Sequence, residues 1–107
     1  MVEKATKSSW FVYLIRTRQG SLYTGITTNV LQRFAEHAGG KKGAKYLRSK
    51  GPLQVVYTSE VGSRSLASKV EYRLKRISKA RKERVVIEQP TKQTLLRLLK
   101  IKEAVFP

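Results

Sequence analysis

The 107-residue sequence contains no cysteine and no aspartate. Without cysteine there are neither disulfides nor thiolate metal sites, and this composition fits a cytoplasmic protein. Without aspartate, a Ser-His-Asp triad cannot form, and a two-metal site of clustered carboxylates is disfavoured. All seven acids are glutamates. A metal site would therefore combine one carboxylate with water and a substrate phosphate, which suits Mg²⁺.

Long apolar runs are also missing. No segment approaches the roughly 18 consecutive apolar residues that a membrane-crossing helix needs. Residues 1–8 read as a polar tail without the apolar core of a signal peptide. We therefore expect no membrane partner. With 40% hydrophobic residues, the chain suits one domain with a modest core.

Positive charge is present in large excess. Lysine and arginine total 23 against seven acids, which gives a formal net charge of +16. Such an excess predicts a polyanionic partner, with nucleic acid far ahead of an anionic membrane surface. Charge alone is equally compatible with a basic protein that has no chemistry of its own, such as a ribosome-associated protein.

The sequence from residue 10 to residue 27 predicts a β-hairpin. Two β-prone runs flank Arg18-Gln19-Gly20, and glycine suits the left-handed last position of a three-residue loop. That loop length pairs Ile15 with Tyr23 and Tyr13 with Gly25. Because side chains alternate with period two, Tyr13 and Tyr23 then share one face, and Gly25 leaves space beside the Tyr13 ring.

A helix is predicted directly after the hairpin. Asn29 or Thr28 is suited to cap it. An apolar stripe is expected to face the protein, formed by Leu31, Phe34, Ala35 and Ala38. Arg33 and His37 lie four residues apart, so they share one edge of the helix beside this stripe.

These residues resemble the GIY-YIG nuclease family, and most of all its small stand-alone bacterial members, the YhbQ-like proteins. The likeness covers about residues 9–80 and rests on an ordered set: Val12-Tyr13-Leu14, Tyr23-Thr24-Gly25, Arg33 and His37. Phe11 stands where the family has the glycine of "GIY", and Thr24 replaces the isoleucine of "YIG". The late asparagine that is usual in the family is absent, since Asn29 is the only asparagine.

The segment that follows the first predicted helix is basic and punctuated by glycine. We expect a short helix over residues 44–49 and contacts with phosphate, although a solvated loop is the alternative. A third strand is predicted over residues 53–59, and a long helix from Ser63 or Ser65 to about Ser78. With Gly25, the expected nucleic-acid contacts come from Lys41, Lys42, Lys45 and Arg48.

Glu71 is the one acid between Ser63 and Arg81, within a strongly basic helix. From the bare sequence, an i,i+4 ion pair with Lys75 is the favoured interpretation. The family resemblance instead implies that Glu71 holds the metal ion. A further basic helix and a last helix capped by Thr91 follow. The sequence leaves open whether that last helix docks on the domain or on a partner.

The predicted fold is therefore a small α+β domain with a three-stranded antiparallel sheet flanked by helices, in the order β-β-α-α-β-α. We expect a tail over residues 1–8, the GIY-YIG-like domain over 9–80 and a helical extension over 81–107. The resemblance implies a Mg²⁺- or Mn²⁺-dependent endonuclease that acts on DNA. Its catalytic residues would be Tyr13, Tyr23, Arg33, His37 and Glu71. The alternatives are a non-catalytic DNA- or RNA-binding module with the same fold and an RNA-bound accessory protein.

Overall fold

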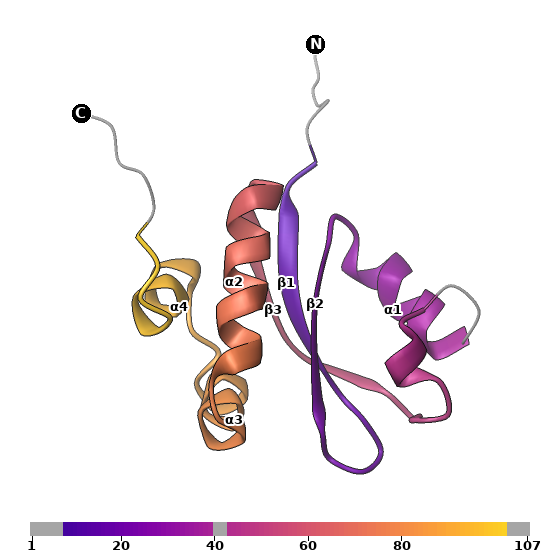
Figure 1. Cartoon of the computed structure of the whole chain (residues 1–107). Helices are drawn as coiled ribbons and strands as arrows, with labels where there is room; N and C mark the ends of the chain where they lie inside the picture. The colour runs from indigo at the N-terminus through magenta and orange to yellow at the C-terminus, as the bar shows by residue number, and fades with distance from the viewer. Residues whose placement is uncertain (1–7, 40–42, 103–107) are drawn as a thin grey trace.

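The computed structural model describes residues 8–39 and 43–102. It has three strands and four α-helices, with one 3₁₀ turn between the second strand and the third (Figure 1). The bounds are β1 Trp10–Arg16, β2 Leu22–Thr27, α1 Val30–Gly39, η1 Lys45–Leu47, β3 Gln54–Gly62, α2 Arg64–Arg76, α3 Lys79–Glu88 and α4 Lys92–Leu98. The predicted α+β class and element order are confirmed, with the expected helix over residues 44–49 reduced to the turn η1.

The hairpin has the register that the sequence predicts. Ile15 pairs with Tyr23 and Tyr13 pairs with Gly25 in the antiparallel β1–β2 ladder. The loop closes through Thr17, whose amide donates to the Ser21 carbonyl at 2.9 Å, and Gly20 is left-handed with φ +91°. A local turn rule therefore decides which side chains of β1 and β2 share a face.

Strand β1 is the centre of the sheet, which has the order β2-β1-β3 with both pairs antiparallel. Its four residues from Val12 to Ile15 are all buried, so both faces of the strand are covered. Val12 and Leu14 belong to the larger core beside the C-terminal helices, whereas Tyr13 and Ile15 pack with Leu47 in a smaller cluster. This smaller cluster positions Tyr13.

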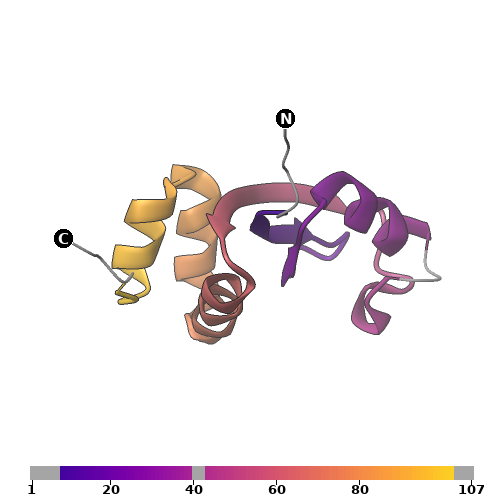
Figure 2. The same cartoon turned by 90° about the horizontal axis from the view of Figure 1, so that it is seen from above.

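The three C-terminal helices share the larger core. Val70 and Leu74 of α2, Val85 of α3 and Leu95 of α4 are fully buried in the same cluster as β1 and β3. The side chains of Ser63, Ser78 and Thr91 cap the three helices by accepting backbone N–H bonds. The last helix thus docks on the domain. Figure 2 shows α3 and α4 on the side of the sheet away from α1.

Helix α1 bears out the predicted apolar stripe at Phe34, which packs against the cluster of Tyr13, Ile15 and Leu47, and contradicts it at the other three residues. Leu31 is 84% exposed, Ala35 and Ala38 are also exposed, and the buried residue of the helix is His37. The helix is capped by Asn29, whose Oδ1 accepts the Gln32 amide at 3.0 Å. It stands beside the sheet rather than lying across it, so a groove of about 490 Å³ stays open between Leu31 and the strands. Among the described helices, none is long and apolar enough to span a membrane.

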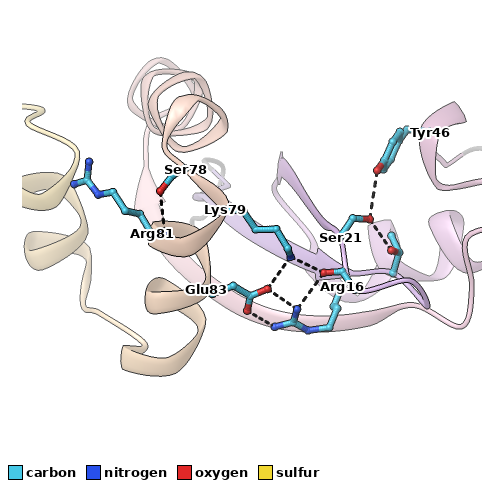
Figure 3. A network of polar contacts seen from close by, with 9 residues as sticks. Arg16, Ser21, Tyr46, Ser78, Lys79, Arg81 and Glu83 are labelled. Atoms are coloured by element: carbon cyan, nitrogen blue, oxygen red, sulfur yellow. Dashed lines mark hydrogen bonds and ion pairs between the residues drawn. The ribbon is translucent and has the colours of Figure 1, made fainter.

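An ion-pair network ties α3 to the hairpin loop (Figure 3). Arg16 donates from both terminal nitrogens to the Glu83 carboxylate, each at 2.7 Å. Lys79 donates to Glu83 at 2.9 Å and to the Gly20 carbonyl at 2.8 Å. Arg16 first, and then Lys79, hold the pKa of Glu83 down at about 2. The network therefore fixes the loop end of the hairpin against α3.

Glu83→Gln is expected to lower the free energy of unfolding at pH 7 by about 1–2 kcal/mol, because it removes a bidentate, partly buried pair. The folded-state pKa of Glu83 is depressed from 4.5 to about 2. Its contribution is therefore present above pH 4.5 and is lost as pH falls toward 2. Denaturant unfolding from pH 7 to pH 2 checks this. Glu88→Gln, which removes the partner of the exposed Arg84, should leave stability nearly unchanged, because solvent screens this pair.

Candidate active site

Three rings from the hairpin and α1 meet on one face of the sheet. The Oη of Tyr13 lies 2.8 Å from His37 Nε2. Ring centroids are 6.4 Å apart for Tyr13 and Tyr23, and 5.5 Å apart for Tyr23 and His37, which meet edge to face. Residues separated by up to 24 positions are therefore brought into one cluster.

Gly25 makes room for the Tyr13 ring. A Cβ atom at position 25 would overlap Oη and Cζ of Tyr13 and would lie 2.9 Å from Cε1. The space that the sequence predicts beside Tyr13 is thus filled by that ring. Gly25 itself is buried. The structure gives it this packing role, and its contact with nucleic acid stays a prediction.

His37 is buried, with 2% exposure, although a lone histidine on a helix is usually a surface residue. The backbone amide of Ala44 donates to its Nδ1 at 2.9 Å. An atom that accepts from an N–H carries no proton, so the neutral ring has its hydrogen on Nε2. Burial, followed by the nearby charge of Arg33, lowers the pKa of His37 and favours this neutral form. Nε2–H therefore donates to the oxygen of Tyr13.

The pKa of Tyr13 is raised from 10.0 to about 12, with burial as the largest cause and Tyr23 as the next. Arg33 lowers this pKa, through its hydrogen-bonding capacity and its charge, while the charge of Glu71 raises it. In the described structure the burial of the ring outweighs Arg33, and Tyr13 is a protonated phenol at neutral pH.

Arg33 lies at the edge of the cluster and pairs with Glu36. Its Nη1 donates to Glu36 Oε1 at 2.8 Å, and 32% of the Arg33 side chain is exposed. Glu36 raises the pKa of Arg33 further. Glu36 was missed in the sequence, although its i,i+3 spacing from Arg33 was a usable signal. The pair holds a guanidinium beside Tyr13 with part of its surface open to solvent.

Glu71 reaches the same neighbourhood from α2. Its carboxylate acts on the pKa of Tyr13, and 25% of its side chain is exposed. It also meets Lys75 at 3.5 Å, a long ion pair. Within residues 8–39 and 43–102, no group of three His, Cys, Asp or Glu residues could enclose a metal ion. A single carboxylate that leaves other positions to water and phosphate fits Mg²⁺ or Mn²⁺.

The basic segment after α1 lies against the rings. Lys45 and Arg48 are exposed, while Lys41 and Lys42 lie outside the described residues. Tyr46 stacks on Tyr23 with centroids 6.0 Å apart, and its Oη donates to Ser21 Oγ at 3.3 Å (Figure 3). No short-range pattern predicts this stack, because the two rings are 23 positions apart in the sequence.

The single histidine makes the proton arrangement measurable. We expect nitrogen-15 NMR to find Nε2 protonated and Nδ1 unprotonated at pH 7. In Gly43→Ala this preference should be lost, because a Cβ at position 43 would lie 2.8 Å from the Glu36 carbonyl and 2.9 Å from the His37 amide. The Ala44 amide would then move away from the ring.

Gly39→Ala is the matched control, since open space surrounds a Cβ at that position. Its spectrum should match that of the wild type. A wild-type ring with the proton on Nδ1, or an unchanged ring in Gly43→Ala, would contradict the proposed role of the Ala44 amide.

Comparison with known proteins finds a matching family and similar sequences. The family described as "GIY-YIG catalytic domain" matches residues 9–84. A UPF0213 protein of Photorhabdus laumondii is 57% identical over 84 residues, which cover 78% of this chain and 80% of that protein. A UPF0213 protein of Yersinia pestis is 55% identical over 89 residues, which cover 83% and 93%.

A solved structure has a similar fold. The NMR structure of a UPF0213 protein from Bacillus halodurans superposes with a TM-score of 0.51 at 36% identity, covering 88% of this chain and 99% of that one. Match, relatives and fold together show that the chain belongs to the GIY-YIG family, as a small bacterial-type member of the UPF0213 group.

Proposed function

We propose that this protein is a metal-dependent endonuclease that hydrolyses phosphodiester bonds in DNA. The observation that carries the proposal is the chain of contacts from the Ala44 amide through His37 to Tyr13, with Arg33 beside the phenol. A buried phenol held by an oriented imidazole next to a cation suits proton transfer at a phosphate. The small size favours structure-selective or weakly specific action, in DNA repair or processing.

In the proposed reaction, a water oxygen attacks phosphorus while the bond to the leaving oxygen breaks. Tyr13 acts in its ionised form, after losing its own proton to solvent; it orients this water and takes the water's proton at Oη. The leaving oxygen takes a proton from solvent. The imidazole Nε2–H cannot take up the proton of Tyr13, because that nitrogen is already protonated. Instead, it stabilises the phenolate by donating to it. Tyr23 contacts the phosphate or a water in the site.

Arg33 neutralises the charge that develops on the phosphate oxygens, for which its planar fork is suited. Glu71, together with water and the substrate phosphate, would hold Mg²⁺ or Mn²⁺. When bound, the ion would polarise a phosphate oxygen and favour the ionised form of groups around it. Exposed Lys45 and Arg48 would hold the backbone of the nucleic acid, with Lys41 and Lys42 from the same segment.

The second candidate is a basic DNA- or RNA-binding module without catalysis. It is favoured by the raised pKa of Tyr13, about 12, because an unactivated phenol is a poor base at neutral pH. The absence of the late family asparagine is a second argument for it. Mg²⁺-dependent nicking of plasmid and branched DNA, with EDTA as the blank, separates the two candidates. Tight binding without any nicking would favour the module.

Arg33→Lys tests the arginine in the same assay. It keeps the charge and loses the fork, so we expect cleavage to fall about 100-fold while DNA affinity changes little. Arg18→Lys, on the exposed hairpin loop, is the matched control and should cleave normally. Near-normal cleavage by Arg33→Lys would show that Arg33 contributes only its positive charge and not its planar fork.

A further inference from the structure

A second concave surface lies between α2 and the end of α4. One hollow of about 450 Å³ is lined by residues of α2 and by the chain after α4. A neighbouring hollow of about 280 Å³ shares Tyr72, Arg73 and Lys100 with it and extends to α3. We call the two together the α2–α4 groove.

The groove is strongly basic. Among the described residues that line it there is no acid, and its cations are Lys69, Arg73, Arg76, Arg81, Lys100 and Lys102. Figure 3 shows Arg81 extending from α3 toward α4, away from the Glu83 network. A concave surface lined by one sign of charge focuses the field on a bound polyanion.

One of these cations stands in a backbone conformation that glycine would adopt with less strain. Lys100 has φ +60°. Its amide donates to the Arg97 carbonyl at 3.1 Å, and the Ile101 amide donates to the Leu96 carbonyl at 2.9 Å. These two bonds form a Schellman motif, whose left-handed position is usually glycine. A lysine there adds strain and places a charge at the groove.

The groove also presents an aromatic ring. Tyr72 is 59% exposed, and the Arg76 guanidinium lies 5.2 Å from its ring centroid. An exposed ring within a line of cations is the arrangement by which proteins hold single-stranded nucleic acid, because bases stack on the ring while phosphates meet the cations. A duplex keeps its bases stacked internally and would not use the ring.

The groove is separate from the candidate active site. Arg73 donates to the Leu99 carbonyl at 2.9 Å on the α4 side of α2. Glu71, two residues earlier, instead acts on Tyr13. In Figure 1, α4 and α1 lie on opposite sides of α2 and the sheet. A strand in the groove would therefore be a part of the nucleic acid other than the bond that is cut.

We propose that the α2–α4 groove binds a single-stranded segment of the nucleic-acid substrate, with Tyr72 as the stacking platform and Lys100 as a phosphate contact. This inference rests on the proposed nucleic-acid partner and not on the proposed catalysis. A substrate with a single-stranded region beside the cut site is the class that uses both surfaces.

Binding of a fluorescent oligothymidylate, measured by anisotropy in EDTA over a salt series, tests the charge of the groove without cleavage. The double variant Lys69→Gln with Arg76→Gln should reduce the slope of log K against log salt by about 1.4, or 0.7 for each phosphate contact. Arg18→Gln with Lys82→Gln removes equal charge elsewhere and should leave the slope unchanged. Equal slopes in the two double variants would overturn the proposal.

Two single variants sharpen the test. Tyr72→Ala should weaken oligothymidylate binding about tenfold and leave duplex binding unchanged. Its control is Ile87→Ala, which removes another exposed side chain from a helix. Lys100→Gly should raise the melting temperature and yet weaken binding, whereas a purely structural lysine would give only the rise.

A poly-glutamate peptide that displaces the oligonucleotide at equal charge concentration would identify a general polyanion surface and overturn the single-strand assignment.

The outcome for catalysis is independent of this test. Groove variants that alter binding in a protein that nicks no DNA would support the groove and refute the nuclease. If the protein nicks DNA and its groove variants bind normally, the nuclease would be supported and the groove proposal refuted.

Discussion

Glu71→Gln is expected to abolish Mg²⁺-dependent cleavage while apo-protein binding to DNA stays equal or becomes tighter. The substitution removes the one carboxylate proposed to hold the ion, and no described cluster of acids can replace it. We expect a loss of about 1000-fold or more, in line with removal of metal-ion stabilisation worth several kcal/mol. Binding should not weaken, because a negative charge that faces phosphate disappears at nearly constant shape.

The competing interpretation of Glu71 is its ion pair with Lys75, at 3.5 Å. A surface pair of this kind predicts a stability change of a few tenths of a kcal/mol and unchanged cleavage. Glu88→Gln is the control, because Glu88 pairs with Arg84 at 2.7 Å with the same i,i+4 spacing. A Glu71→Gln variant that nicks as well as the wild type and the Glu88→Gln control would refute the metal role.

Tyr13→Phe is expected to reduce cleavage by about 100-fold or more, because the variant cannot take up a proton from the attacking water. The pKa of Tyr13 is about 12 before metal and substrate bind. Wild-type cleavage should therefore rise with pH across the neutral range, as the small phenolate fraction grows. The variant should lose this rise. Single-turnover cleavage from pH 6 to pH 9 measures both effects.

Stability must be controlled in this variant, since the Nε2–H of buried His37 would lose its acceptor, a loss that costs about 1–3 kcal/mol. Tyr57→Phe is the matched control: Tyr57 is also buried, and its Oη donates to the Pro90 carbonyl at 2.8 Å. Tyr57→Phe should also lose stability, because the Pro90 carbonyl loses its donor. Its cleavage rate and pH profile should stay those of the wild type. If cleavage by Tyr13→Phe retained the wild-type rise with pH, another group would be the base.

The register of the hairpin shows which features follow from short-range sequence patterns. The three-residue loop, closed by left-handed Gly20, places Tyr13 opposite Gly25 as the sequence predicts. The helix caps at Asn29, Ser63 and Thr91 follow from the same kind of short-range hydrogen bonding. Each of these features depends on residues within a few positions of one another, so a single sequence carries the information.

Helix α1 shows where such rules stop. Its pattern of Leu31, Phe34, Ala35 and Ala38 is amphipathic, and yet of these four only Phe34 packs against the domain, while the fully buried residue is His37. Periodicity predicts that a helix has an apolar face. It does not predict whether the sheet lies close enough to bury that face. Here the partners that decide are the Tyr13 phenol and the Ala44 amide, which bind the two ring nitrogens of His37.

The sequence alone predicts the α+β class, the positive charge, the hairpin face shared by Tyr13 and Tyr23, and the helices that carry Arg33 and Glu71. These follow from composition, periodicity and local turn chemistry. Three further properties appear only in the folded structure: the proton position on His37, the raised pKa of Tyr13 and the gathering of cations around Tyr72. Those properties depend on burial and on atoms from distant segments. The free energy of a charge or a hydrogen bond depends on how buried it is and on which groups surround it.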